Sequence, residues 1–349
     1  MARVLLVHEP PDGGVAENAL QLASRLGTHG YTVQVAGPQQ AVTYGRLAEA
    51  GVAVHRLPLV RGYGRPLCDA RALRGLVALL RNERPDLVHC HSAKAGVLGR
   101  LAARASGVPA VYSPHCFPFV GEFGVTRRFF ATSVECALGR AATAAILCVA
   151  EEERASALRR RVASPSRLRV VSNGSEPCDG TVALDPALLA LRERGPVAAA
   201  VTVMRPQKRL DVLIDAAPLV FERLPEARLA IVGEGPLQEE LHARAAALGL
   251  DRDERFTFLP FSAPAARHLR ALDVFVESSG WEGLPISILE ALACGVPQVA
   301  THVGGTAEAV ADGHTGLLVP AHDAPALAAA IAALLADRPR REAMAVASR

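Results

Sequence analysis

The hydrophobic positions in the first half of the chain form short apolar runs that alternate with longer amphipathic stretches. Turn residues bound the runs, which is the pattern of buried strands joined by surface helices. The runs predict strands at Arg3–Val7, Thr32–Ala36, Val52–Arg56, Leu87–Cys90, Ala110–Ser113, Ile146–Val149 and Arg167–Val171. The amphipathic stretches predict helices at about Val15–Gly27, Ala70–Arg84 and Lys94–Ala105. Such alternation is typical of a parallel sheet with helices on both faces.

The same pattern restarts in the second half. Residues 173–195 begin with several Gly, Pro, Asp and Ser residues, and we interpret them as a linker. Strands are then expected at Val197–Thr202, Arg228–Val232, Phe256–Leu259, Val274–Glu277, Gln298–Ala300 and Gly316–Val319. Helices are expected at Arg209–Arg223, Leu237–Leu248, Ile286–Ala293, Ala307–Ala311 and Ala324–Ala336. The sequence thus predicts two doubly wound domains, residues 1–172 and 196–349, with a ligand in the cleft between them.

The composition fits a globular chain of two domains, since half of its 349 residues are hydrophobic. No apolar run reaches the roughly 18 residues that span a bilayer. The first apolar run is too short for a signal peptide and is interpreted as a strand. Seven cysteines are scattered singly, without a C-x-x-C pair. We therefore expect a cytoplasmic protein whose thiols are free and mostly buried.

Charge is distributed unevenly along the chain. Residues 1–172 hold 22 Lys and Arg against 12 Asp and Glu, whereas residues 173–349 hold 16 against 23. The basic first half could face an anionic membrane or substrate, or it could reflect only an arginine-rich composition. Of 38 basic residues only Lys94 and Lys208 are lysines. Both positions stand out, because a compact ammonium and a planar guanidinium suit different partners.

Loops that follow the predicted strands carry candidate ligand groups. Gly233 begins a Gly-Glu-Gly-Pro loop whose bare backbone N–H groups could approach a ligand. Arg205 and Lys208 follow the first strand of the second half and suit a diphosphate, although they could also be a solvated charge pair. The turn at Asp12-Gly13-Gly14 lacks the G-x-G-x-x-G spacing, and no acid ends the second strand. These two departures argue against an NAD enzyme.

Two acids flank the start of the helix expected at Ile286. Glu282 lies in the turn before it and Glu290 on its second turn, with Gly283 and Leu284 between them. A proline is tolerated in the first turn, and the positive end of the helix favours anions. The spacing suits one acid for a sugar, one for a ribose and the helix start for phosphates. The alternative is a pair of solvated surface acids.

This arrangement resembles the E-x7-E motif of the family-four retaining glycosyltransferases with the GT-B fold. The resemblance covers nearly the whole chain. The matching pieces are Asp12-Gly13-Gly14-Val15, His89 to Gly96, Ser113-Pro114-His115, Arg205 with Lys208, Val232 to Pro236, and Trp281 to Pro285 with Glu290. The resemblance implies an α/β architecture of two Rossmann-like domains facing across a cleft. The first domain would bind the acceptor and the second a nucleotide-sugar donor.

The resemblance also implies roles for individual residues. Arg205 and Lys208 would hold the diphosphate, Glu290 the ribose and Glu282 the transferred sugar. His115 matches the histidine that contacts the sugar near the reacting carbon. Further donor contacts are implied for Gly233, for Gly14 beside the diphosphate, for Gly283 and Leu284 as backbone donors, and for Leu259 and Phe261 along the base.

The sequence departs from the family pattern in two places. Family members often separate the arginine and the lysine by a longer gap, which falls on Val203 here. They also usually continue beyond the position of Arg349 with a helix that packs on the first domain. This chain is therefore either truncated or supports domain closure differently.

The expected mechanism needs neither a metal nor another cofactor. The resemblance implies retention of configuration by same-face attack, with the leaving phosphate taking the acceptor proton. Negative charge that develops on the diphosphate would be stabilised by cations and by the helix start. Asp251-Arg252-Asp253 is interpreted as a charged loop or helix cap. His89, interpreted as structural, forms no metal cluster with His91 and His115, because no carboxylate or cysteine sits at a supporting spacing.

The acceptor is expected to bind the first domain. The segment Gly124–Ala141 places Arg127 and Arg128 next to Phe129 and Phe130. On a helix these residues could touch a membrane interface, or the helix could pack in the core with a basic first turn. The membrane interpretation predicts a lipid-linked or envelope glycan acceptor and a protein peripheral on the inner face of the cell membrane. No nucleic-acid partner is expected.

Two alternatives stay open at this point. A non-hydrolysing nucleotide-sugar epimerase shares the architecture but would need acids in the first domain, where the candidates Glu122, Glu135 and Glu151–Glu153 lack a motif-like setting. A catalytically inactive partner subunit is the other alternative. The presence of Glu282, Glu290, Lys208 and His115 argues against it.

Overall fold

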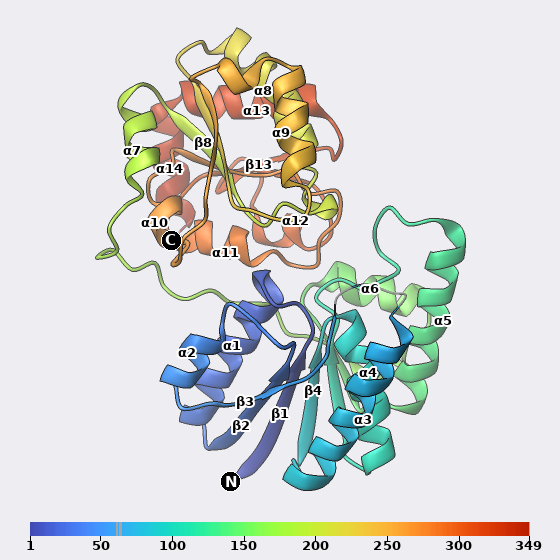
Figure 1. Cartoon of the computed structure of the whole chain (residues 1–349). Helices are drawn as coiled ribbons and strands as arrows, with labels where there is room; N and C mark the ends of the chain where they lie inside the picture. Colours follow the sequence, from blue (N-terminus) through green and yellow to red (C-terminus); the bar gives the residue numbers. More distant parts are fainter. Residues whose placement is uncertain (61, 63–64, 349) are drawn as a thin grey trace. The chain divides into compact units, whose positions relative to one another are not determined.

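The computed structural model describes residues 1–60, 62 and 65–348. Contacts divide the chain into two compact units, unit 1 at Met1–Asn173 and unit 2 at Gly174–Arg349. Each unit has its own sheet and is described by itself (Figure 1). The segment interpreted as a linker includes helix α7 (Pro186–Glu193) of unit 2.

Unit 1 is built on a parallel sheet of seven strands in the order β3-β2-β1-β4-β5-β6-β7. The strands are β1 (Ala2–His8), β2 (Tyr31–Gly37), β3 (Ala53–Arg56), β4 (Leu87–His91), β5 (Ala110–Ser113), β6 (Ala145–Cys148) and β7 (Leu168–Val170). The helices are α1 (Gly13–Thr28), α2 (Tyr44–Glu49), α3 (Pro66–Glu83), α4 (Ala93–Ser106), α5 (Val125–Ala141) and α6 (Glu151–Arg159). Every strand that the sequence predicts for this half is present.

Alternate residues of β1 are buried against different helices, because successive side chains of a strand point to opposite faces. Leu6 belongs to the same buried cluster as Leu20 of α1. Leu5 belongs to the cluster that contains Leu76 of α3. Figure 1 shows α1 and α2 on one side of the sheet and α3 and α4 on the other. Both faces are therefore covered, as the apolar strand sequences predict.

Unit 2 is built on a parallel sheet of six strands in the order β10-β9-β8-β11-β12-β13. The strands are β8 (Val197–Val201), β9 (Arg228–Val232), β10 (Phe256–Leu259), β11 (Val274–Glu277), β12 (Gln298–Thr301) and β13 (Gly316–Val319). Besides α7, the helices are α8 (Leu210–Arg223), α9 (Gln238–Ala247), α10 (Ala266–Leu269), α11 (Ile286–Ala293), α12 (Thr306–Ala309), α13 (Ala324–Ala336) and α14 (Arg338–Ser348). Successive side chains of its central strand, β8, are also buried against different helices. Ala198 lies in one cluster with Leu213 of α8, and Ala199 in another with Ile288 of α11.

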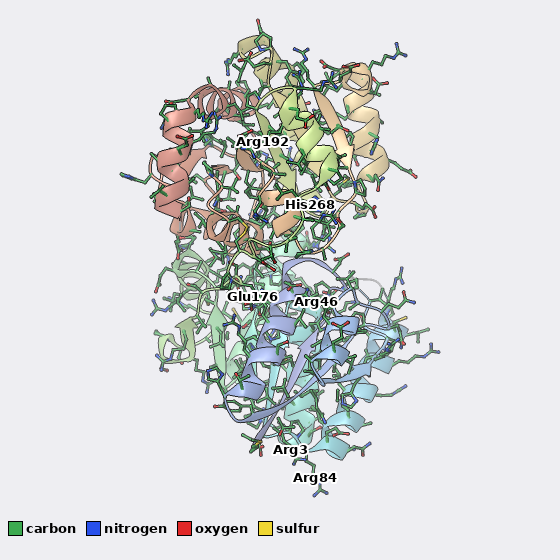
Figure 2. The ribbon with its side chains drawn as sticks, turned by 90° about the vertical axis from the view of Figure 1, so that its left-hand side faces the viewer. Arg3, Arg46, Arg84, Glu176, Arg192 and His268 are labelled. Carbon is green, nitrogen blue, oxygen red and sulfur yellow. A yellow bond between two sulfur atoms is a disulfide. The ribbon has the colours of Figure 1, made fainter. Side chains whose placement is uncertain are left out.

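The strand order reverses at one place in each sheet, between β1 and β4 in unit 1 and between β8 and β11 in unit 2. Doubly wound sheets bind ligands at such a reversal, beyond the carboxyl ends of the strands. The opposite end of the unit 1 sheet is marked in Figure 2 by Arg3, whose guanidinium donates to the carbonyl oxygen of Arg84 at 2.7 Å. In unit 2, the loop with Lys208 follows β8 and the loop with Glu282 follows β11. The fold therefore puts both loops at the reversal.

The expectation that all thiols are free is wrong for one pair. Cys178 and Cys294 form a disulfide across 116 residues of sequence, with their Cα atoms 4.9 Å apart. The segment before α7 returns to α11, where Ser175 donates to the carbonyl oxygen of Leu289 at 3.2 Å. Only this return brings the two cysteines within bonding range, so their spacing in the sequence gives no sign of it. The free cysteines of the described chain are Cys68, Cys90, Cys116, Cys136 and Cys148.

No helix among the described residues combines enough length and apolar character to cross a membrane.

Candidate active site

Lys208 lies in the loop between β8 and α8, at the end of a single 3₁₀ turn over Pro206–Lys208 that Arg205 precedes. The loop after β9 crosses the start of this loop at Gly233, whose φ is 143°. A Cβ atom at Gly233 would lie 1.9 Å from the carbonyl oxygen of Thr202. Only glycine fits there, both for its backbone conformation and for its size. The glycine turn therefore lets two loops meet at the edge of the sheet.

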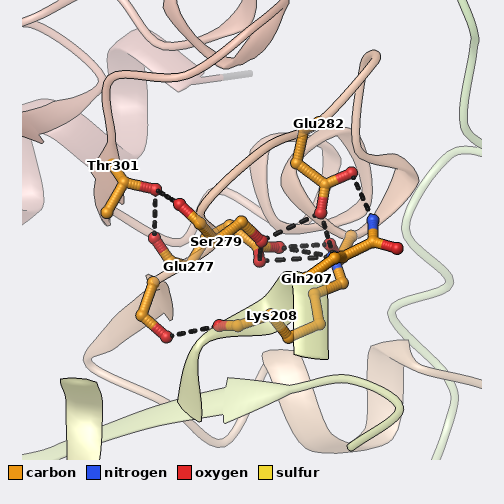
Figure 3. A network of polar contacts seen from close by, with 8 residues as sticks. Gln207, Lys208, Glu277, Ser279, Glu282 and Thr301 are labelled. Carbon is orange, nitrogen blue, oxygen red and sulfur yellow. Dashed lines mark hydrogen bonds and ion pairs between the residues drawn. The ribbon is translucent and has the colours of Figure 1, made fainter. Parts of the chain in front are cut away.

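The ammonium of Lys208 contacts two carboxylates (Figure 3). Its Nζ lies 2.7 Å from Oε1 of Glu282, and 3.2 and 3.3 Å from Oε1 and Oε2 of Glu277. The hydroxyl of Ser279 is within hydrogen-bonding distance of both acids. The amide of Gln207 donates to Oε2 of Glu282 at 3.0 Å. We call these five residues the Lys208 network.

The Lys208 network is nearly closed to solvent. The side chain of Lys208 is 14% exposed, that of Glu277 2% and that of Glu282 7%. Burial by itself would lower the pKa of a lysine. The two carboxylates more than offset this effect and raise the pKa of Lys208 above its usual range. The ammonium therefore stays charged at physiological pH and offers a fixed cation at the edge of the sheet.

Hydrogen bonds join the loop after β8 to the loop after β11. The hydroxyl of Ser278 donates to the carbonyl oxygen of Lys208 at 2.8 Å. The backbone N–H of Gly280 donates to the carbonyl oxygen of Gln207, also at 2.8 Å. Thr301, at the end of β12, donates to a carbonyl of the second loop at 2.6 Å. These bonds fix both ends of the ion pairs, so that the charged groups are held by the backbone.

Gly304 fixes the backbone at Glu282. Its φ is +48°, and a Cβ atom there would lie 2.0 Å from the carbonyl oxygen of Glu282. The N–H of Gly305 donates to the carbonyl oxygen of Gly283 at 2.6 Å. The sequence analysis did not single out these glycines. A Gly-Gly pair that follows a buried strand was the available signal.

Helix α11 begins at Ile286 with Pro285 as its N-cap, so the predicted helix is confirmed. Gly283 and Leu284 precede it and are buried. Glu290 lies on its second turn and is half-buried. The positive N-terminal end of α11 therefore lies at the loop that carries Glu282. A helix N-terminus favours a bound anion. That these residues bind a nucleotide stays a prediction.

The residues expected along a base lie where β10 ends. Leu259 is the last residue of β10, and its carbonyl oxygen accepts from the N–H of Gly233 at 2.9 Å. The ring of Phe261 is 47% exposed and lies 5.4 Å from the ring of His268, measured between centroids. His268, labelled in Figure 2, is buried and accepts from the N–H of Ser262 at 3.0 Å. An exposed aromatic ring on a braced loop offers a stacking face to a planar base.

In unit 1, imidazole rings meet at the carboxyl ends of β4 and β5. Nδ1 of His91 lies 2.9 Å from Nε2 of His115. The ring of His89 lies 4.0 Å from that of His91, and its Nε2 bonds to the hydroxyl of Ser113 at 2.8 Å. Burial lowers the pKa of His89 to about 3 and that of His115 to about 4. Both imidazoles are therefore neutral at physiological pH.

Two further residues predicted in unit 1 are His115, after β5, and Gly14, after β1. His115 has a φ of 56°, a left-handed conformation that is uncommon outside glycine. Gly14 lies in the first turn of α1, which begins at Gly13 and not at Val15 as predicted. The glycine turn therefore belongs to the helix start, where backbone N–H groups are available to an anion.

Glu277, Gln207 and Ser279 are candidates that the sequence analysis missed. A signal existed for Glu277, because it ends an otherwise apolar strand at the edge where doubly wound sheets bind ligands. Gln207 and Ser279 carried no such signal, since polar residues are common in loops.

Among the residues that the structure describes, no group of three or more His, Cys, Asp or Glu side chains is arranged to hold a metal ion. Asp253 pairs with Arg255 at 2.7 Å, as expected of a charged loop.

The acids of unit 1 that an epimerase would need have structural partners. Glu135 is buried, binds the guanidinium of Arg100 at 2.8 Å and accepts from the hydroxyl of Tyr112 at 3.1 Å. Glu153 accepts from the backbone N–H of Val149 at 2.7 Å. The epimerase alternative therefore gains no support.

Comparison with known proteins gives matches in both units. The family model of the glycosyl transferase 4-like domain matches residues 13–174. The family model of the glycosyl transferases group 1 matches residues 195–337.

Individual proteins are similar over most of the chain. A D-inositol 3-phosphate glycosyltransferase of Kribbella flavida is 33% identical over 300 residues, which are 81% of this chain and 70% of that protein. A UDP-Gal:alpha-D-GlcNAc-diphosphoundecaprenol alpha-1,3-galactosyltransferase of Escherichia coli is 29% identical over 263 residues, 73% of this chain and 67% of that protein. Among solved structures, Anabaena Alr3699/HepE in complex with UDP-glucose is similar with a TM-score of 0.83 at 21% identity, covering 100% of this chain and 93% of that one.

The buried histidines predict how unit 1 responds to acid. His89 and His115 have folded-state pKa values of about 3 and 4, below the unfolded value of 6.5. Between these values the unfolded chain binds more protons, so stability falls as the pH falls. The free energy of unfolding should drop by up to about 1.4 kcal/mol per pH unit for each such histidine. Hydrogen exchange in unit 1 between pH 7 and 5 measures this slope. His89→Gln should flatten it, and an unchanged slope would contradict the assignment.

The contact at Gly304 predicts an unequal pair of glycine substitutions. Gly304→Ala and Gly249→Ala both place alanine at a positive φ, +48° and +74°, but only the first meets a neighbouring atom within 4 Å. Each should lose roughly 1 kcal/mol from the backbone conformation. Gly304→Ala should lose more and should also displace Glu282, which thermal unfolding and activity measure together. Equal losses in the two variants would show that the contact has no effect.

Proposed function

Because the chain belongs to the glycosyl transferases group 1 family and has the GT-B fold, we propose that it is a retaining, metal-independent transferase acting on a lipid-linked or envelope glycan. Family membership makes it a glycosyltransferase with a nucleotide-sugar donor. The stereochemistry, the independence of metal and the acceptor are the proposal. The main support for this proposal is the contact of 2.7 Å between Lys208 and Glu282, which places a cation suited to phosphate next to an acid suited to sugar hydroxyls.

The proposed donor site lies at the reversal of the unit 2 sheet. Lys208 and Arg205 bind the diphosphate, with the backbone N–H groups of Gly283 and Leu284 at the start of α11. Glu282 accepts hydrogen bonds from the transferred sugar. The position of these groups on two loops joined by hydrogen bonds supports the proposal, since a rigid site holds a reacting group in place.

The rest of the nucleotide extends to neighbouring strand ends. Glu290 accepts from the ribose hydroxyls, and Leu259 and Phe261 line the base. The exposed ring of Phe261 supports this assignment. Gly233, which lets the loop after β9 pack against Thr202, contributes a backbone contact to the donor.

In the proposed reaction, the bond between the anomeric carbon and the diphosphate oxygen breaks and its electron pair stays on the diphosphate. The acceptor oxygen forms the new bond on the same face of the sugar, and its proton passes to the leaving phosphate. Lys208 and Arg205 stabilise the charge that develops, and fixed cations of this kind supply much of the rate enhancement in such sites. No divalent cation is required for this role.

The proposal also assigns roles to neutral groups of unit 1. His115 contacts the sugar near the reacting carbon, and its pKa of about 4 leaves the imidazole uncharged. It therefore serves as a hydrogen-bonding partner and not as a general acid at neutral pH. Gly14, at the start of α1, offers its backbone N–H to the diphosphate.

Helix α5 supports a lipid-linked acceptor. Val125, Phe129 and Phe130 are 83%, 73% and 65% exposed. The opposite face of α5, with Ala131, Glu135 and Leu138, is buried, so the helix packs in the core as the alternative expects and leaves these three side chains outside it. Arg127 and Arg128 lie beside them, and apolar side chains with adjacent cations suit an anionic bilayer. The acceptor of the Escherichia coli relative is a diphosphoundecaprenol. We therefore place this chain peripherally on the inner face of the cell membrane, with the acceptor bound by unit 1.

Release of nucleoside diphosphate tests the donor assignment. With UDP-, GDP- and ADP-sugars and a chelator, one donor should give free nucleoside diphosphate, and Glu290→Ala should lose it. Lys208→Met should lower kcat by about 10²- to 10³-fold, because it removes the cation at the leaving group. Lys94→Met is the matched control, since it removes the other buried ammonium, which pairs with Asp69 at 2.8 Å.

The outcomes separate the parts of the proposal. Loss of activity with the chelator would contradict metal independence. Conversion of the sugar without release of nucleotide would contradict the transferase. The anomeric configuration of the product, measured by NMR, should equal that of the donor.

Vesicle binding tests the role of α5. A Phe129→Ser, Phe130→Ser double variant should lose at least about tenfold in affinity for anionic phospholipid vesicles, because two exposed phenyl rings no longer enter the interface. Leu67→Ser is the control, since Leu67 is 75% exposed in unit 1 but lies outside α5. Equal binding by the double variant and the wild type in a co-sedimentation assay would rule out docking by this face.

A further inference from the structure

Glu277 belongs to the Lys208 network but has no part in the proposed transfer. Its side chain is 2% exposed. It accepts hydrogen bonds from Ser279 and from Ser287, the latter at 2.9 Å, besides its contact with Lys208. A carboxylate buried to this degree is costly unless it is paired. Binding a diphosphate requires the cation of Lys208 and gives no reason for a second acid on it.

The charges of the network do not balance. Lys208 carries one positive charge, and Glu277 and Glu282 each carry one negative charge when ionised. The carboxylate of Glu277 lies 3.2 Å from the nitrogen that a diphosphate would contact. At such distances, and with little solvent to screen it, one buried charge strongly affects another. Glu277 must therefore oppose the binding of any anion at Lys208.

The two acids are held differently. Glu277 ends β11, and serine hydroxyls bond to both of its oxygens. Glu282 lies in the following loop, and besides Lys208 it binds the side chains of Gln207 and Ser279, one at each carboxylate oxygen. Because Glu282 lies on a loop and Glu277 ends a strand, Glu282 is the acid that turns to the sugar when a donor binds at Lys208, whereas Glu277 stays.

We propose that Glu277 weakens the hold of Lys208 on the diphosphate and thereby promotes release of the nucleoside diphosphate product. The inference rests on the proposed function. The product carries more negative charge than the donor once its terminal phosphate has lost its proton, because the bond to the sugar is gone. The repulsion by Glu277 therefore acts more on the product than on the donor, and it favours turnover over retention.

Removing the charge of Glu277 should strengthen nucleotide binding, whereas removing a residue that only supports the fold should weaken it. Isothermal titration of UDP, GDP and ADP compares the wild type with Glu277→Gln, which keeps the shape and removes the charge. The Kd of the nucleotide that the wild type binds should fall about tenfold or more in the variant. Both kcat and the KM for the donor should fall, since product then occupies the site for longer. Loss of a structural support would instead weaken binding.

Two further variants keep the test decisive. Glu277→Leu also removes the charge and replaces Glu277→Gln if that variant does not fold. Ser287→Ala removes one hydrogen bond to Glu277 but keeps the charge, so its Kd should stay close to that of the wild type. Equal or weaker nucleotide binding by the folded uncharged variants would overturn the inference and leave the proposed function intact. If neither the wild type nor the variants bind any of the three nucleotides, both the proposed function and this inference fail.

Discussion

The buried ion pairs of Lys208 are the interaction on which the arrangement of unit 2 depends. Charges that are 14% exposed or less are stable only when every partner is in place. The surrounding structure supplies these partners through two loops, a glycine contact at Gly304 and the hydroxyl of Thr301. The reversal of strand order between β8 and β11 brings the loops together, and their hydrogen bonds hold them. The chemistry of the site and its stability therefore come from the same contacts.

The two units carry different chemistry at the carboxyl ends of their strands. Unit 2 places a cation and two acids beyond its reversal, whereas unit 1 places neutral imidazoles beyond the ends of β4 and β5. Burial without a counter-charge keeps His115 neutral, and burial with two counter-charges keeps Lys208 positive. The proposed roles, stabilising developing charge for Lys208 and binding a hydroxyl for His115, thus match the charge states that their surroundings impose.

Much of the fold could be predicted from the sequence, because short, continuous apolar runs joined by amphipathic stretches are typical of a parallel sheet that is buried on both faces. The strands Ala110–Ser113, Arg228–Val232 and Gly316–Val319 have the predicted ends. The helices α6 and α14 were not predicted, since their sequences EEERASALR and RPRREAMAVAS are too polar to show an apolar period. The disulfide between Cys178 and Cys294 and the contact of Gly304 with Glu282 join residues far apart in the sequence. The pattern of residues within a short segment carries no information about such long-range contacts. The same limit applies in part to Glu277: the polar end of an apolar strand marks its position, but only the fold shows that Lys208 is its partner.

The most direct test of the central claim is a crystal structure of the protein with its nucleoside diphosphate. The account predicts that Nζ of Lys208 bonds to a phosphate oxygen, that Glu277 keeps its contact with Lys208, and that Glu282 has moved away from it. A phosphate bound elsewhere, with the contact between Lys208 and Glu282 unchanged, would contradict the account.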